Sequence, residues 1–224
     1  RLIKSLEDVK VEYDMTVRNN KNKIIQFSYG DDGFDTIKIE FQSFPIVKMS
    51  LEEIYAHFNF PNDKEIINNL LFTSKALSSI KSQQKDANIR IKNIIDYMIE
   101  YRSKVIKNVF KDLDNSTVHI PVAFNHIINN IQGQHLINLN STVDISPLEA
   151  LNIIDNGFSI LETLTYSKPN ELFKLMYYYY LCPRELLIIK RFNRRALHLL
   201  IDEIILLYKK SIVSPGEMVG MIAA

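Results

Sequence analysis

Apolar residues recur at helical spacing along most of the chain. The strongest pattern runs from Asn88 to Lys111, where apolar side chains share one side of the expected helix and cations share the other. The apolar members are Ile91, Ile94, Ile95, Met98, Val105, Ile106, Val109 and Phe110, and the cations are Arg90, Lys92, Arg102, Lys104 and Lys107. Similar patterns predict helices over residues 1–18, 64–81, 121–131, 147–157, 169–181, 183–190 and 193–210.

Several helix boundaries carry recognisable capping residues. Ser50-Leu-Glu-Glu53 and Ser146-Pro-Leu-Glu149 each place a hydroxyl at the N-cap and a carboxylate three residues later, which predicts a capping box. Asn193 is expected to cap the last long helix. Gly133 and Gly157 are expected to end the helices that precede them.

Strand-like alternation is confined to one segment. Ile25, Phe27 and Tyr29 alternate with polar residues over residues 23–30, which predicts a strand. Polar, turn-forming residues cluster at 112–119 and 132–144, where we expect loops. The sequence therefore predicts a mainly α fold with a small β element.

The composition narrows the class of protein without identifying it. The 224 residues carry a formal net charge of +1, so any nucleic-acid contact must come from a local group of cations. Cys182 is the only cysteine, which excludes an internal disulfide; we expect a small, buried side chain in a reducing, intracellular compartment. No apolar run approaches the roughly 20 residues that cross a bilayer, so no membrane contact is expected.

The most informative motif is residues 214–224, Ser-Pro-Gly-Glu-Met-Val-Gly-Met-Ile-Ala-Ala. It resembles the segment that leads into the trigger loop of the largest subunit of multisubunit DNA-directed RNA polymerases, where the pattern continues with Gln-Ser-Ile-Gly-Glu-Pro. Its apolar and small residues need a covering surface. We therefore expect the chain to be a piece of a longer protein, truncated inside this motif.

Other segments carry the same resemblance. Parts of residues 1–35 resemble the end of the bridge helix and the strand after it in the eukaryotic-type enzyme. Residues 118–130 resemble a stretch of the shelf and foot region, although His126 stands where the family has a basic residue. Residues 182–201 resemble the helical lead-in to the trigger region. The stretches between these segments are expected to be the most divergent part of the foot.

The resemblance implies an order of domains and a function. Residues 1–20 would be the C-terminal end of the bridge helix, 21–49 a strand and loop segment of the cleft, 50–210 a helical shelf and foot module, and 211–224 the truncated lead-in to the trigger loop. The implied function is a structural scaffold that supports the bridge helix and trigger loop during DNA-templated transcription. The whole enzyme would be a nucleotidyltransferase.

The resemblance also implies partners and a compartment. Other polymerase subunits, especially the second-largest and the small shelf-binding subunits, would contact the chain, and RNA-processing factors would bind the foot. The eukaryotic-type motifs and the high Asn, Ile and Lys content favour a large cytoplasmic DNA virus, such as the African swine fever virus group, as the source. The compartment would be the cytoplasm for a viral enzyme and the nucleus for a cellular one.

Arg1 and Lys4 are the candidate DNA contacts. The resemblance places them at bridge-helix positions near template or downstream DNA, where two cations three residues apart would neutralise phosphates without reading bases. A solvated basic helical turn is the alternative. The family's magnesium-binding aspartates lie in a separate upstream segment, and the catalytic trigger-loop residues lie beyond Ala224. No catalytic residue, metal site or cofactor is therefore expected in this chain, although the whole enzyme would bind Mg²⁺.

Tyr29-Gly-Asp-Asp32 offers a competing function. The same four residues form the metal-binding hairpin of viral RNA-dependent RNA polymerases, where acidic oxygens hold Mg²⁺. Here Gly33 and Asp35 continue the pattern of the DNA-dependent enzyme, and paired acids beside glycine favour a turn. A stand-alone helical protein-interaction module is the other alternative.

Aromatic and histidine residues give weaker signals. Tyr177 to Tyr180 cannot all share one face of a helix, so we expect them to be wedged between helices or against another subunit, with a base-stacking platform as the alternative. The histidines lack the spacing of a zinc site. They are His57, His119, His126, His135 and His198.

Overall fold

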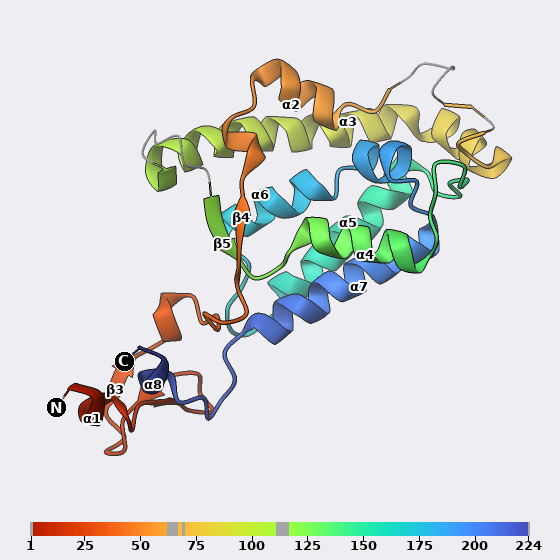
Figure 1. Cartoon of the computed structure of the whole chain (residues 1–224). Helices are drawn as coiled ribbons and strands as arrows, with labels where there is room; N and C mark the ends of the chain where they lie inside the picture. Colours follow the sequence, from red (N-terminus) through yellow and green to blue (C-terminus); the bar gives the residue numbers. More distant parts are fainter. Residues whose placement is uncertain (1, 62–66, 69, 111–116, 224) are drawn as a thin grey trace.

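The structure, a computed structural model, describes residues 2–61, 67–68, 70–110 and 117–223. Figure 1 shows a large group of helices and, at the lower left, a small region in which both chain termini lie. We call the described residues from 40 to 211 the helical body. We call residues 2–32 and 213–223 the terminal module.

The helical body contains most of the helices. They are α2 (Leu51–Phe58), α3 (Ser74–Val105), α4 (Phe124–Gln134), α5 (Pro147–Glu162), α6 (Glu171–Tyr180) and α7 (Arg194–Ser211), with π-helical turns η3 (Ile106–Phe110) and η4 (Arg184–Ile189) and a 3₁₀ turn η2 (Pro45–Val47). The helices predicted near 169–181, 183–190 and 193–210 are confirmed, the second as a π-helix.

The predicted caps are formed. The side chains of Ser50 and Ser146 accept hydrogen bonds from the backbone N–H groups three residues later, and the glutamates there accept the N–H groups of the serines. The side chain of Asn193 accepts the N–H of Ala196 at 2.8 Å. These local hydrogen bonds satisfy N–H groups that have no partner within the helix, which is why the starts of α2, α5 and α7 were predictable.

Helix α3 is longer than predicted at its N-terminal half. The patterns predicted one helix over 64–81 and another from Asn88, whereas the structure has one helix of 32 residues from Ser74, capped by Thr73. The segment between the two patterns, residues 81–88, contains no Gly or Pro and several good helix formers, so nothing interrupts the helix. Residues 62–66 and 69, which include part of the first predicted helix, lie outside the described residues.

Neither glycine that was expected to end a helix does so. Gly133 lies inside α4, which begins three residues after Pro121 and is C-capped by His135. Gly157 lies inside α5, and a Cβ added there would be 2.3 Å from Cγ2 of Ile201 on α7. Gly157 therefore allows two helices to approach closely, which the local sequence pattern does not reveal.

The N-terminal helix predicted over residues 1–18 is wrong beyond its first turns. Helix α1 (Leu2–Leu6) is followed by strands β1 (Lys10–Val11), β2 (Val17–Arg18) and β3 (Ile24–Gln26), which pair antiparallel in that order. Val9, Val11 and Val17 are β-branched and buried, and Met15 between them has φ +65°. Such residues favour extended chain over helix. The strand predicted over 23–30 is confirmed only for Ile24–Gln26, in its first half, where all three side chains are exposed; its last residues belong to a 3₁₀ turn that starts at Tyr29.

A second antiparallel pair was not predicted. Strand β4 (Glu40–Ser43) pairs with β5 (Thr117–Ile120), so the last part of the loop expected over 112–119 is a strand. Residues 111–116 lie outside the described residues. The loop expected over 132–144 is confirmed after α4 ends. Overall the fold is mainly α with a small β element, as predicted.

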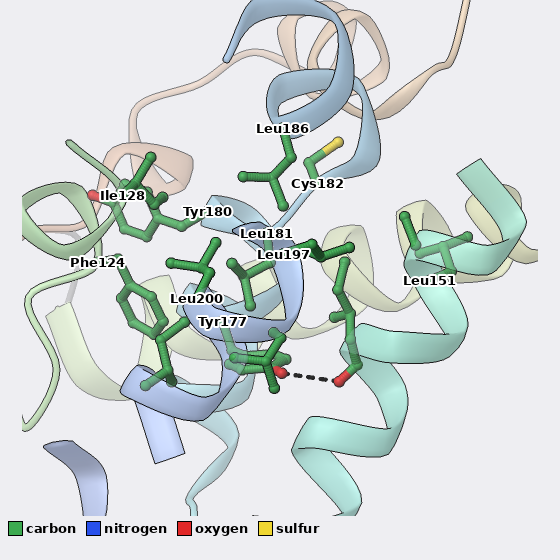
Figure 2. Close-up of a cluster of buried hydrophobic side chains, with 14 of the residues drawn as sticks. Phe124, Ile128, Leu151, Tyr177, Tyr180, Leu181, Cys182, Leu186, Leu197 and Leu200 are labelled. Carbon is green, nitrogen blue, oxygen red and sulfur yellow. Dashed lines mark hydrogen bonds between the residues drawn. The ribbon is translucent and has the colours of Figure 1, made fainter. Parts of the chain in front are cut away.

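The four consecutive tyrosines pack inside the helical body. Tyr177 is fully buried, and its hydroxyl donates a hydrogen bond to the carbonyl oxygen of Ile154 at 2.9 Å (Figure 2). Tyr180 stacks on Phe124 with ring centroids 5.3 Å apart, and Tyr179 stacks on an imidazole of α2. The predicted wedge between helices is confirmed.

Cys182 lies in the same core, as expected for a small buried side chain. Burial raises the pKa of its thiol to about 12. Within the described part of the chain, no helix combines the length and apolar character that a bilayer span requires.

Candidate functional site

The terminal module brings residues from the two ends of the sequence together. The backbone N–H of Val11 donates to the carbonyl oxygen of Glu217 at 3.0 Å, and the N–H of Gly216 donates back to the carbonyl of Val11 at 2.6 Å. The N–H of Gly220 donates to the carbonyl of Val9 at 3.1 Å. The segment before α8 (Val219–Ala223) is thus held against β1 by main-chain hydrogen bonds. In Figure 1, α8 and α1 lie in the same small region at the lower left.

Two glycines of the C-terminal motif have specific structural roles. A Cβ added at Gly220 would lie 1.9 Å from the carbonyl oxygen of Leu6 and 2.8 Å from Cβ of Val9. Because the first of these contacts is with backbone, no side-chain rotation could relieve it. Gly216 has φ +89°, which L side chains rarely adopt. The motif therefore fixes both the turn into α8 and the close approach of α8 to α1.

The interior of the terminal module is a small cluster of valines, separate from the core of the helical body. Its buried members are Val9, Val11, Val17, Val213 and Val219. Val11 and Val17 come from β1 and β2, Val9 lies just before β1, and the other two come from the C-terminal segment. Burial of the C-terminal motif thus depends on the N-terminal strands.

A short bridge joins the terminal module to the helical body. The N–H of Asp35 donates to the carbonyl of Ser211 at 2.8 Å, and the N–H of Val213 donates to the carbonyl of Gly33 at 3.0 Å. Gly33 has φ +76°, and a Cβ there would be 2.2 Å from Oγ of Ser167. The bridge therefore lies against the helical body where α7 ends.

Asp35 is one of the few buried charged residues of the described chain. Burial alone would raise the pKa of Asp35, but the N–H of Ile37 and the ammonium of Lys38, 3.0 Å away, hold it below its usual value. A carboxylate in this setting stays ionised and fixes the turn that follows the bridge.

The candidate DNA contacts are only partly described. Lys4 lies on α1 with an exposed side chain and makes no ion pair with any described residue. Arg1 lies outside the described residues, so the paired geometry stays a prediction. Two other cations of the module are paired locally, since Lys10 pairs with Glu12 at 3.2 Å and Arg18 pairs with Asp14. Lys21 and Lys23 are exposed and, like Lys4, make no ion pair with a described residue.

Tyr29-Gly-Asp-Asp32 forms a turn. Residues Tyr29–Asp31 make one 3₁₀ turn, η1, with Gly30 and Asp31 at positive φ, and the side chain of Asp32 accepts the N–H of Phe34. Both aspartates are exposed, and no cluster of three His, Cys, Asp or Glu residues within the described ranges could hold a metal ion. The residues do not fit the two-strand metal hairpin of an RNA-dependent polymerase.

The histidines are spread over separate elements. The Nε2 atom of His57 lies 3.0 Å from the carbonyl oxygen of Tyr179, and His119 packs on the ring of Phe41. His198 is exposed on α7. These three histidines therefore lie on α2, β5 and α7, and the expectation about zinc stays a prediction.

Sequence reasoning missed the residues that assemble the terminal module. It singled out Lys4 and the tyrosines, but it assigned no role to Gly33, Gly216 or Gly220. The sequence did contain a hint, because each glycine belongs to a segment that resembles the polymerase family: Gly33 to residues 1–35, and Gly216 and Gly220 to residues 214–224. Only the structure shows why glycine is required, through the positive φ of Gly33 and Gly216 and the close approach of Gly220 to Leu6.

A comparison with protein families matches the whole chain. The family described as RNA polymerase Rpb1, domain 5, matches residues 1–224, which is the whole chain. The matched range includes the N-terminal strands and the C-terminal motif that the structure brings together. The chain therefore belongs to the RNA polymerase Rpb1 domain 5 family and is a part of the largest subunit of a DNA-directed RNA polymerase.

Proposed function

We propose that this part of the subunit is a scaffold that fixes the end of the bridge helix relative to the lead-in to the trigger loop. The observation that supports this proposal is the terminal module, in which main-chain hydrogen bonds join β1 to the segment before α8. In this proposal α1 is the end of the bridge helix and α8 begins the path toward the trigger loop. The helical body is then the shelf and foot.

Close backbone contact suits such a role. Because Gly220 approaches the carbonyl of Leu6 with no room for a side chain, α8 cannot slide along α1 without breaking hydrogen bonds or separating the two helices. A displacement at one segment would therefore be transmitted to the other. Catalysis that depends on positioning is sensitive to shifts of about 1 Å.

The scaffold contributes no catalytic group in this proposal. The polymerase is a nucleotidyltransferase, and its Mg²⁺ would be held by carboxylates of other segments, because the exposed pair Asp31 and Asp32 lies on a turn. As a part of a polymerase subunit the chain assembles with other subunits. We propose that these include the second-largest subunit and small subunits on the shelf, with RNA-processing factors on the foot.

We further propose that Lys4, with Arg1, contacts the phosphate backbone of template or downstream DNA. Lys4 is exposed and makes no ion pair with a described residue, so its charge is available. Lys4→Glu in the whole polymerase should weaken DNA binding and reduce the slope of affinity against salt by about 1. Lys81→Glu, at an exposed position of α3, is the control. An unchanged slope of affinity against salt for Lys4→Glu would contradict the proposed DNA contact.

The coupling itself is tested by Gly220→Ala in the whole enzyme. The new methyl group must separate α8 from α1, so we expect the rate of nucleotide addition to fall about tenfold, corresponding to about 1.4 kcal/mol. Gly133→Ala is the matched control, since a Cβ there meets no described atom within 4 Å. Normal elongation by the Gly220 variant would contradict the proposed coupling.

The viral source predicted from composition stays a prediction. A stand-alone interaction module has no observation in its favour, because the family match extends over the whole chain.

A further inference from the structure

A groove runs between α4 and α7 on the surface of the helical body. Figure 1 shows the two helices side by side. Two hollows, of about 350 Å³ and about 640 Å³, adjoin there and share His126, Ile127 and Leu207 as lining residues. We call them together the α4–α7 groove. Its larger hollow extends to Ser211, Ile212 and Ser214, beside the bridge to the terminal module.

The groove has an apolar floor. Ile127 is buried, Leu207 is half-buried, and two further apolar side chains stand open to solvent, Leu199 at one end with 40% exposure and Ile37 at the other with 74%. Continuous exposed apolar surface of this kind marks interaction sites in soluble proteins. The polar groups of the rim include His126, which is exposed.

The charges of the groove differ between its two ends. Lys209 and Lys210 line the larger hollow, are exposed, and form no ion pair with a described residue. A third cation there, Lys38, is neutralised by Asp35 at 3.0 Å. The smaller hollow has Glu203 instead. The larger hollow is also lined by one exposed carboxylate, that of Glu40. Lys209 and Lys210 therefore give this hollow a net positive charge beside apolar surface.

We propose that the α4–α7 groove binds a protein segment that presents apolar side chains to the floor and carboxylates to Lys209 and Lys210. The segment belongs to another component of the transcription machinery, since a polymerase subunit acts within an assembly. Complementary charge would fix the direction of the segment, and apolar burial would supply most of the affinity.

The same features disfavour a nucleic acid as the occupant. A single strand bound in a groove requires cations along its whole length and aromatic rings for base stacking. Here the cations are confined to one end and the other end carries Glu203. Within the described chain, the only aromatic rings that line the hollows are the imidazoles of His126 and His135, and no Phe or Tyr ring does. A protein segment matches both the apolar floor and the uneven charge.

Photo-crosslinking in the purified, complete polymerase tests this inference. Leu199→p-benzoylphenylalanine and Ile37→p-benzoylphenylalanine place a probe at each end of the groove. We expect both probes to crosslink to peptides of one other protein component, with two or more carboxylates near the site crosslinked by the Ile37 probe. Crosslinks to nucleic acid alone, or no intermolecular crosslink from either probe, would overturn the proposal.

Charge variants test the role of the two lysines. In the Ile37-probe enzyme, Lys209→Glu combined with Lys210→Glu should lower the crosslink yield at least tenfold, and the double Gln variant should lower it less. The matched control is Lys81→Glu combined with Lys85→Glu on the exposed face of α3. Because Lys209 and Lys210 also favour the C-terminus of α7, subunit incorporation is measured for each variant. Equal yields for the Gln variant, the Glu variant and the parent would contradict the proposed recognition.

Discussion

The terminal module and the helical body are stabilised by different kinds of contact. In the terminal module, main-chain hydrogen bonds join segments from opposite ends of the sequence around a small group of valines. In the helical body, large aromatic and aliphatic side chains from all of the long helices share one core. The module thus depends on glycines that let backbones approach, whereas the body depends on the volume and shape of its side chains.

This difference has a consequence for motion and function. A body with a continuous core resists local deformation, because each buried side chain contacts several elements. A module held by few buried side chains opens at a lower free energy. The proposed scaffold therefore combines a rigid support with a smaller element that can follow the moving parts of the polymerase.

The largest effect is expected from a core tyrosine of the helical body. Tyr177→Ala removes a fully buried ring and leaves the carbonyl of Ile154 without its hydroxyl donor. We expect the free energy of unfolding to fall by about 3–5 kcal/mol, measured by denaturant titration. Tyr177→Phe keeps the ring and should cost about 1–3 kcal/mol. A loss below about 1 kcal/mol for the Ala variant would show that the body does not depend on this core.

The next largest effect compares two helical glycines, Gly157 at a close helix contact and Gly133 on an open helix surface. In Gly157→Ala the new methyl group would lie 2.3 Å from Ile201, and such overpacking costs about 1–3 kcal/mol. Replacing glycine by alanine inside a helix stabilises it by roughly 1 kcal/mol. We therefore expect a net decrease in the free energy of unfolding. Gly133→Ala has only the propensity gain and should raise the free energy of unfolding by up to about 1 kcal/mol. Thermal unfolding of both variants gives the comparison. Equal stabilisation by the two changes would mean that α5 and α7 do not pack as described.

Alkaline pH should weaken the helical body through Cys182. Burial raises the pKa of this thiol from 9.0 to about 12, so the unfolded state ionises first. The contribution to stability is complete below about pH 9 and is lost as the pH rises toward 12, at no more than about 1.4 kcal/mol per pH unit. Denaturant titrations over this range should show a shallower decline for Cys182→Ala. Identical pH slopes would contradict the burial of the thiol.

Acid should affect the terminal module first, with the smallest change in total stability. The hydroxyl of Thr16, its backbone N–H and the guanidinium of Arg18 hold the pKa of Asp14 below its usual 3.8. The stabilisation is present above pH 3.8 and is lost as the pH falls through the lowered pKa of the folded state. As the pH is lowered, NMR methyl resonances of Val11 and Val17 should change at a higher pH than those of the helical body. Asp14→Asn should abolish this acid transition of the terminal module. Simultaneous loss of both regions would show that they unfold as one unit.

The local sequence was sufficient where the deciding interaction is local. The capping boxes at Ser50 and Ser146 and the cap at Asn193 join residues three positions apart, so their hydrogen bonds follow from the order of residues alone. Helical periodicity located the C-terminal half of α3, and it located α6 and α7 to within about two residues at each end, for the same reason. The family resemblance added the identity of the polymerase subunit, which the family comparison confirms.

The errors lie where a distant segment decides the conformation. Residues 10–18 have some helical periodicity, but Val11 bonds to Glu217 and joins a cluster that includes Val213 and Val219. Strand β4 is a strand because Glu40–Ser43 pairs with residues about 80 positions later. Position 157 inside α5 holds a glycine because Ile201 and Tyr177 leave no room for a larger side chain. In each case the free energy of the local secondary-structure preference is small compared with that of the tertiary contacts.

By itself, the sequence determined the mainly helical class, most helix starts and the polymerase family, because these depend on residue order within short motifs. Tertiary structure alone decided that the first and last motifs form one module, that Gly220 must be glycine, and that α4 and α7 leave a groove with two free lysines. The physical reason is that close backbone contacts and the shape of the surface depend on segments that are far apart in the sequence. A local sequence pattern carries no information about how close such segments lie in space.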